Sequence, residues 1–163
     1  MQNRYFFYGL LIGITLPIIF VVYQFVFAAN VQTINLTDDS YKDLNGKSVS
    51  LLDLNKKPLV LNYWATWCEP CVKEFKDFER FQNKYGNFFN IVMISDESTA
   101  KIKNFKDKNQ YNFIFLKSTK KLELLGISIR PSTFFINKKG EVIVNNLGSL
   151  NFEKIVVNSN KLK

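Results

Sequence analysis

The chain has 163 residues and a formal net charge of +8, with two cysteines and no histidine. Without an imidazole it cannot form a Ser-His or Cys-His nucleophile pair, a histidine-ligated zinc site or a histidine-ligated haem. Two cysteines also cannot close a four-thiolate zinc or iron–sulfur site within one chain.

The first 29 residues are predicted to be a single transmembrane helix. Residues 5–29 are almost continuously apolar. As a helix rising about 1.5 Å per residue they span about 37 Å, more than the roughly 30 Å of a bilayer's hydrocarbon core. The alternative is a secretory signal, although its apolar region would be longer than the usual one. Arg4 precedes the span, so the positive-inside rule places the N-terminus in the cytoplasm and the rest of the chain outside.

The remaining chain is predicted to be a short linker followed by one globular domain. Residues 30–40 are polar and form the linker, and residues 41–163 suffice for a single domain. The basic residues are mostly scattered lysines, without an arginine cluster or an aromatic platform. We therefore expect solvated faces and no nucleic-acid binding.

Hydrophobic periodicity predicts strands that first alternate with helices and then form a hairpin. Asn45-Gly46 is typical of a hairpin turn, with an alternating Val49/Leu51 run after it. The remaining strands are expected at 59–64, 89–95, 113–116, 133–136 and 142–144, and the helical segments at 70–85, 99–108, 120–125 and 151–161. Gly86 is placed to end the first helix and Ser98 to cap the second. This order indicates an α/β fold with a mixed sheet flanked by helices.

Both cysteines lie in the segment Trp67-Cys68-Glu69-Pro70-Cys71, between the predicted central strand and the predicted long helix. Free backbone N–H groups and the positive end of the helix dipole stabilise a thiolate at Cys68 and lower its pKa, which makes it the candidate nucleophile. Cys71 lies within one helical turn, where it can form a disulfide and resolve a mixed one. Pro70 needs no hydrogen-bond donor in the first turn and stiffens the pair.

The two thiols have other interpretations. A purely structural disulfide closing so small a loop would restrain the unfolded chain little. A zinc site would need more ligands, and reduced packing cysteines do not suit an oxidising compartment. A Cu(I) carrier using both sulfurs is the alternative function, although Met1 and Met93 lie far from the motif in sequence. A non-enzymatic interaction module is a third possibility.

Residues 60–75, VLNYWATWCEPCVKEF, resemble the active-site segment of thioredoxin-fold proteins. The likeness is to the membrane-anchored TlpA/ResA-like thiol-disulfide oxidoreductases in particular. It extends over about residues 41–150 and includes Arg130-Pro131-Ser132-Thr133-Phe134 where this family has its cis-proline. The resemblance implies a thioredoxin-like fold, a redox-active cysteine pair and no cofactor.

The resemblance also implies roles for single residues. Cys68 matches the attacking cysteine and Cys71 the resolving one, while Glu69 and Pro70 match the dipeptide that tunes the pair. Pro131 matches the proline that lies against the disulfide and leaves the neighbouring backbone free to hold an extended substrate segment.

Glu74 matches a buried acid of the family. It shares a helix face with Cys71 at a spacing of three residues, so its carboxylate could raise the pKa of that thiol or accept its proton. The alternative is an ordinary glutamate in solvent. Asn62 departs from the cytoplasmic thioredoxins, which carry a buried aspartate there, and this departure shifts the proton-handling role towards Glu74.

Two bulky residues flank the expected site. Trp67 is expected to shield the sulfurs, with a core tryptophan as the alternative. Arg130 is expected to face the substrate and select acidic clients, or to point into water.

We therefore expect an extracytoplasmic thiol-disulfide oxidoreductase, held by a single-pass anchor in the cytoplasmic membrane. It would reduce protein disulfides, with the maturation of c-type cytochromes as the process that the resemblance suggests. A transmembrane thiol reductase is the expected electron donor.

Overall fold

The computed structural model describes residue 13, residues 15–23 and residues 34–162. The chain divides into two compact units, residues 1–33 and residues 34–163. In the first unit, residues 15–23 are helical. Within the described part of the chain, no helix combines the length and apolar character needed to cross a membrane. The predicted anchor over residues 1–29 falls largely outside the described residues.

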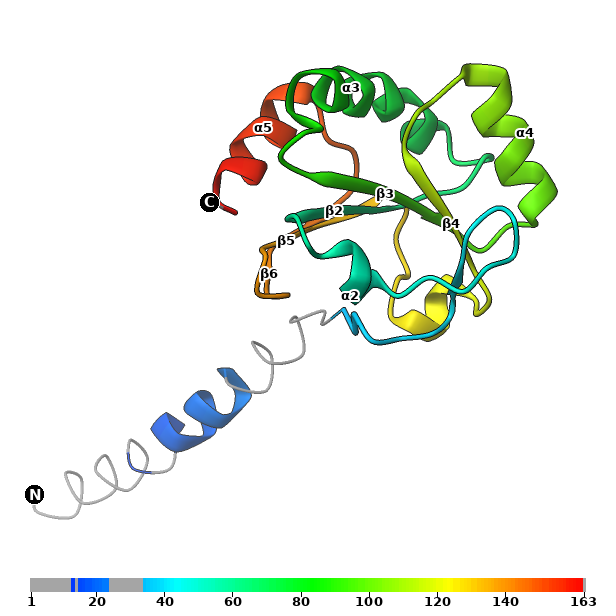
Figure 1. Cartoon of the computed structure of the whole chain (residues 1–163). Coiled ribbons are helices and arrows are strands. Elements are labelled where there is room, and N and C mark those ends of the chain that lie inside the picture. Colours follow the sequence, from blue (N-terminus) through cyan, green and yellow to red (C-terminus); the bar gives the residue numbers. More distant parts are fainter. Residues whose placement is uncertain (1–12, 14, 24–33, 163) are drawn as a thin grey trace, which may run out of the picture. The chain divides into compact units, whose positions relative to one another are not determined.

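A six-stranded mixed sheet forms the centre of the second unit (Figure 1). Its order is β1-β4-β3-β2-β5-β6. β2 pairs in parallel with β3 and β3 with β4, while β5 runs antiparallel to both β2 and β6. The predicted parallel half with a following antiparallel hairpin is confirmed. The strands are β1 (Tyr41–Lys42), β2 (Leu59–Tyr63), β3 (Asn90–Ser95), β4 (Ile114–Ser118), β5 (Ser132–Ile136) and β6 (Val142–Leu147).

Helices cover both faces of this sheet (Figure 1). One face carries α3 (Glu69–Tyr85), α4 (Thr99–Asn109) and α5 (Phe152–Asn160), and the other carries α2 (Leu51–Leu54) and the 3-10 helix η1 (Leu122–Leu125). Successive side chains of a strand point to opposite faces, so Val60 joins the first core and Leu59 and Leu61 the second. Every residue of β2 is buried, as predicted for a central strand.

An aromatic cluster fixes α3 against the sheet. The ring of Trp64, directly after β2, lies 4.8 Å from that of Phe75 in α3, with the two rings edge to face. Phe105 of α4 and Phe115 of β4 also contact Trp64, at 4.6 Å and 5.9 Å between ring centroids. Pairs of this kind stabilise a core beyond the area that they bury. The start of α3 is therefore held rigidly beside the end of β2.

The predicted hairpin at Asn45-Gly46 is confirmed, but the strand expected after it is wrong at Leu51. Gly46 has a φ of 88°, which suits glycine, and Lys42 bridges antiparallel to Ser48. From Leu51 the chain forms the short helix α2, because the Ser50 hydroxyl accepts a hydrogen bond from the Leu52 N–H and caps the first turn.

The ends of the other helices lie close to their predicted positions. α3 starts one residue earlier than expected, and Gly86 caps its last turn. A Cβ at Gly86 would lie 2.6 Å from the Gln82 carbonyl oxygen, so a close approach requires the glycine here. Ser98 caps α4 through the N–H of Lys101, as predicted.

The segment expected as a linker contributes to the domain from Ile34 onward. Leu36 is buried in the second core, and its carbonyl accepts a hydrogen bond from the Leu52 N–H at 3.1 Å. This backbone bond ties the entering chain to α2.

Candidate active site

Cys68 and Cys71 form a disulfide at the start of α3, with 5.2 Å between their Cα atoms. Cys68 is the N-cap of the helix, and its sulfur accepts a hydrogen bond from the Cys71 N–H at 3.3 Å. A thiolate at this sulfur would be stabilised by that N–H and by the helix dipole. The structure therefore places both cysteines as the sequence predicts.

Both cysteines are buried, but not equally. The Cys68 residue retains 5% of its surface, whereas Cys71 retains none. A client therefore has more access to Cys68 than to Cys71. This asymmetry agrees with the predicted order of attacking and resolving cysteines.

Pro131 lies beside the turn that carries the cysteines. The Arg130–Pro131 peptide bond is cis, as the resemblance implied. Pro131 immediately precedes β5, whose first residue, Ser132, pairs with Tyr63 at the end of β2. The proline and the cysteine turn thus leave the sheet at the same edge.

Glu74 is buried in the second turn of α3 and retains 2% of its surface. Its two carboxylate oxygens accept one hydrogen bond each, from Asn62 Nδ2 at 2.7 Å and from the Leu150 N–H at 2.9 Å. Burial raises the pKa of Glu74 to about 7, because desolvation of the charged form outweighs these two hydrogen bonds. The solvent-exposed alternative is therefore wrong, and this carboxyl can change protonation state near neutral pH.

Asn62 connects Glu74 to the strand that follows Pro131. Besides Glu74, its amide group donates to the hydroxyl of Thr133 in β5 at 3.0 Å. The position that carries an acid in cytoplasmic thioredoxins thus serves here as a buried hydrogen-bond donor to an acid on α3. The Asn62 side-chain oxygen is buried and has no hydrogen-bond partner.

For each of the two bulky residues beside the site, the structure excludes one of the two expectations. Trp67 keeps 68% of its surface exposed, so it is not a core tryptophan. The Arg130 side chain is only 10% exposed and lies 2.8 Å from a Glu123 carboxylate oxygen and 3.6 Å from one of Asp96. The expectation that Arg130 points into water is wrong, because its side chain is largely buried and paired with two acidic side chains of the protein itself. The expectation that it faces a substrate and selects acidic clients stays a prediction. The Arg130 guanidinium also lies 5.6 Å from the centre of the Trp67 ring.

Glu69 and Pro70, the two residues between the cysteines, are both exposed to solvent. Glu69 forms an ion pair with Lys73 at 2.7 Å, and the hydrogen bond from Lys73 lowers the pKa of Glu69. Pro70 occupies the first helical turn, where no backbone donor is required.

Residues 30–145 match the AhpC/TSA family. The chain belongs to this family. Over 146 residues it is 34% identical to the thiol-disulfide oxidoreductase ResA of Bacillus subtilis, covering 83% of this chain and 79% of ResA. The likeness to ResA-like proteins inferred from the motif is confirmed.

Solved structures agree on the thioredoxin-like fold. StoA of Bacillus subtilis superposes with a TM-score of 0.60 at 22% identity, covering 76% of this chain and 98% of StoA. A DsbF homologue of Corynebacterium diphtheriae gives a TM-score of 0.64 at 26% identity, covering 74% of this chain and 81% of that protein.

A groove of about 630 Å³ lies beside the cysteine motif of this AhpC/TSA-family chain. It is bounded by Trp67 and Arg130 and by charged residues of both signs after β3 and around η1. Its charged lining consists of Asp96, Glu97, Lys101, Lys121, Glu123 and Arg130.

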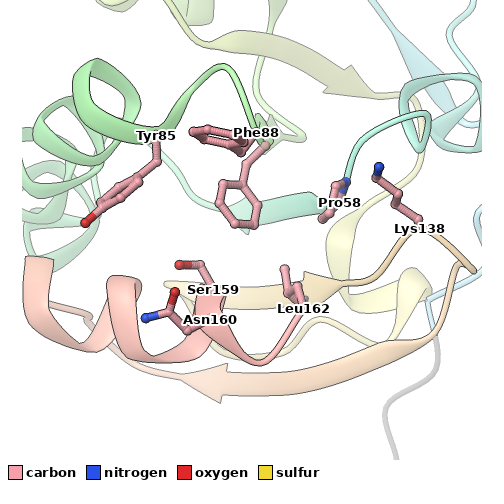
Figure 2. Close-up of a pocket in the computed structure, with 8 residues that line it drawn as sticks. Pro58, Tyr85, Phe88, Lys138, Ser159, Asn160 and Leu162 are labelled. Carbon is pink, nitrogen blue, oxygen red and sulfur yellow. The ribbon is translucent and has the colours of Figure 1, made fainter.

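A second, mostly apolar pocket of about 410 Å³ lies at the other end of α3 (Figure 2). Figure 2 shows Tyr85 and Phe88 facing Ser159, Asn160 and Leu162 across it. Since α3 has 17 residues, its two ends are about 25 Å apart at about 1.5 Å per residue. This pocket therefore takes no part in chemistry at the cysteines.

Sequence reasoning missed Asp96 and Glu97, which directly follow β3. Glu97 accepts hydrogen bonds from the backbone N–H and the hydroxyl of Thr66, two residues before Cys68. The sequence could have indicated these two residues, because β3 runs parallel to β2 and the carboxyl ends of parallel strands meet at one edge of a sheet. Polar residues directly after both strands are therefore neighbours.

Proposed function

We propose that this thiol-disulfide oxidoreductase reduces protein disulfides on the extracytoplasmic side of the cytoplasmic membrane. The observation that carries the proposal is the disulfide-bonded pair at the start of α3, in which Cys68 is the N-cap and keeps some exposed surface while Cys71 keeps none. Such a pair supports thiol–disulfide exchange and requires no cofactor.

Reduction of a client begins from the dithiol form. The Cys68 thiolate attacks one sulfur of the client disulfide, the client S–S bond breaks, and the other client sulfur leaves as a thiolate that takes up a proton. Cys71 then loses its proton and attacks Cys68 in the mixed disulfide. The client leaves as a dithiol, and the protein is left with the Cys68–Cys71 disulfide seen in the structure. Two electrons pass to the client.

Glu74 is the proposed acceptor of the Cys71 proton. It lies three residues after Cys71 on the same helix, and the hydrogen bonds from Asn62 and Leu150 fix its carboxylate inside the protein. A buried acid with a pKa of about 7 can take a proton from a thiol and release it again at neutral pH. Glu69 and Pro70 tune the pair, and the exposed Trp67 forms one rim of the client site.

Client binding is assigned to the segment around Pro131. Proline has no backbone N–H, so the edge beside it is free to hold an extended client segment next to the disulfide. The charge of Arg130 is already paired with Asp96 and Glu123. Its proposed role is to fix the position of the segment at Pro131.

The proposed cellular setting is supported by the sequence and by the likeness to ResA. Residues 5–29 are apolar enough for a single-pass anchor, and Arg4 favours an extracytoplasmic domain. Regeneration of the dithiol then needs electrons from a transmembrane thiol reductase. The proposed clients are haem-binding cysteines of c-type cytochromes, on the strength of the resemblance to ResA.

The proposal is tested by trapping in cells. The Cys71→Ser variant keeps the attacking sulfur but cannot resolve the mixed disulfide, so it should accumulate disulfide-linked clients in the membrane fraction. The Cys68→Ser variant is the matched control and should trap none. In the same cells, alkylation before lysis should find the wild-type pair mainly reduced. A mainly oxidised pair would overturn the reducing direction, and equal trapping by both variants would overturn the assignment of the attacking cysteine.

The side of the membrane is tested separately. A thiol reagent that cannot cross the membrane should label Cys68 of the reduced protein in intact spheroplasts. Labelling only after lysis would refute the extracytoplasmic location.

A further inference from the structure

Two consecutive acidic residues after β3 contact both sides of the candidate active site. Glu97 reaches the turn that carries Cys68, and Asp96 reaches the segment that leads to Pro131. Both side chains are largely buried, with 8% exposure for Glu97 and 10% for Asp96.

The contact of Glu97 with the cysteine turn is bidentate. One carboxylate oxygen accepts from the Thr66 backbone N–H at 2.6 Å, and the other accepts from the Thr66 hydroxyl at 2.8 Å. Hydrogen bonds to an ionised acceptor are stronger than those between neutral groups. Thr66 lies inside the turn that the Cys68 N–H closes on the Ala65 carbonyl at 3.1 Å. Fixing Thr66 therefore fixes the N-cap position of Cys68.

The contacts of Asp96 lead to the opposite side. Its carboxylate accepts from the Leu122 N–H at 3.2 Å, at the first residue of η1, and lies 3.6 Å from the Arg130 guanidinium. Arg130 immediately precedes Pro131 and is held at 2.8 Å by Glu123, which also belongs to η1. Asp96, η1 and Arg130 thus form one connected support for the segment beside the disulfide.

We propose that Asp96 and Glu97 are positioning residues of the exchange reaction. Glu97 holds the Cys68 sulfur over the start of α3, and Asp96 holds, through Arg130, the client-binding segment at Pro131. The inference rests on the proposed function only in that client reduction starts at Cys68. Because the two contacts serve different steps, loss of Glu97 should alter the reactivity of Cys68, and loss of Asp96 should alter client binding.

The test for Glu97 compares two variants that both remove its negative charge. Glu97→Gln can still accept from the Thr66 N–H and donate to the Thr66 hydroxyl, whereas Glu97→Ala can do neither. At pH 7 we expect alkylation of Cys68 in the reduced protein to be about threefold slower in Glu97→Ala than in Glu97→Gln, because a looser turn weakens the N–H contact to the thiolate. We expect kcat/KM for a disulfide-bonded peptide to differ about tenfold in the same direction.

Equal rates in these two variants would overturn the role of Glu97, even if the Tm of Glu97→Ala were lower. Should Glu97→Ala fail to fold, Thr66→Val removes only the hydroxyl contact and should slow Cys68 alkylation about twofold relative to Thr66→Ser. If this slowing is absent, the role of Glu97 is likewise overturned.

A wild-type protein that is alkylated at Cys68 but reduces no peptide would refute the proposed function, while the alkylation comparison would still decide the role of Glu97.

The test for Asp96 reads client binding. Asp96→Ala should raise the KM for the disulfide peptide about fivefold while leaving the alkylation rate of Cys68 unchanged, since Asp96 contacts the opposite side of the site. Asp96→Asn, which can still accept from the Leu122 N–H, should show a smaller rise. An unchanged KM in Asp96→Ala, or a slowed alkylation of Cys68 equal to that in Glu97→Ala, would refute separate roles for the two residues.

Discussion

Replacing Glu74 by glutamine should change how the stability of the protein depends on pH. In the folded protein the pKa of Glu74 is raised from 4.5 to about 7, chiefly because burial penalises the carboxylate. Between these two values the folded state binds a proton that the unfolded state does not. Stability therefore falls as the pH rises from about 4.5 to about 7, and this contribution is constant above that range.

The size of the effect follows from the same two values. A difference of about 2.5 in pKa, at about 1.36 kcal/mol for each pKa unit, corresponds to about 3 kcal/mol. Glutamine cannot ionise, so the Glu74→Gln variant does not lose this free energy of unfolding as the pH rises. Its amide can be accommodated by rotation of the Asn62 amide, whose oxygen has no partner in the present arrangement. The free energy of unfolding of the variant minus that of the wild type should therefore increase by up to about 3 kcal/mol between pH 4.5 and pH 8.

Urea unfolding of the oxidised proteins at several pH values measures this difference, and other titrating groups cancel in it. Glu79→Gln is a matched control, because Glu79 is an exposed glutamate on the same helix. The difference in unfolding free energy between Glu79→Gln and the wild type measures what loss of a surface carboxylate on α3 does by itself. If the difference for Glu74→Gln changes with pH no more than that for Glu79→Gln, the pKa of Glu74 is not raised in the folded protein, and its proton-accepting role is refuted.

Three further predictions concern the scaffold around the site. Phe75→Ala removes a fully buried ring that packs on Trp64 and should lower the free energy of unfolding in urea by about 3–5 kcal/mol. Ser98→Ala removes the cap of α4 and should cost about 1 kcal/mol in the same assay, whereas Ser98→Asp should largely preserve stability. Lys73→Ala breaks only the exposed pair with Glu69, and because water screens this pair we expect a smaller loss of unfolding free energy than in Ser98→Ala. An equally large loss in the same assay would contradict this screening.

The fold was largely predictable because its signals are local. The short apolar runs at β2 and β3 and the spacing of apolar residues along α3 specify element type from neighbouring residues alone. The position of the cysteines at the junction of β2 and α3 follows directly from these elements. At α2, two local signals competed: the alternation at Val49 and Leu51 suggested a strand, but the Ser50 cap favoured a helical turn.

The charged surroundings of the site were not predictable in the same way. The charge of Arg130 is paired with Asp96 and Glu123, which belong to other parts of the fold. The sequence around Arg130 does not indicate these partners. The burial of Glu74 similarly depends on Asn62 and on the Leu150 backbone, 76 residues away along the chain. Such contacts arise where η1, α3 and the segments after β3 and before α5 come together, and sequence spacing along one helix does not specify them.

The reactivity of the individual thiols tests the assignment of Cys68 as the attacking sulfur most directly. The reduced protein is treated with a limiting amount of iodoacetamide across a range of pH, and mass spectrometry locates the modified cysteine. We predict modification of Cys68 ahead of Cys71, with a midpoint below the ordinary thiol pKa of about 8.5. Faster modification of Cys71, or a midpoint for Cys68 at or above that ordinary value, would contradict the proposed mechanism.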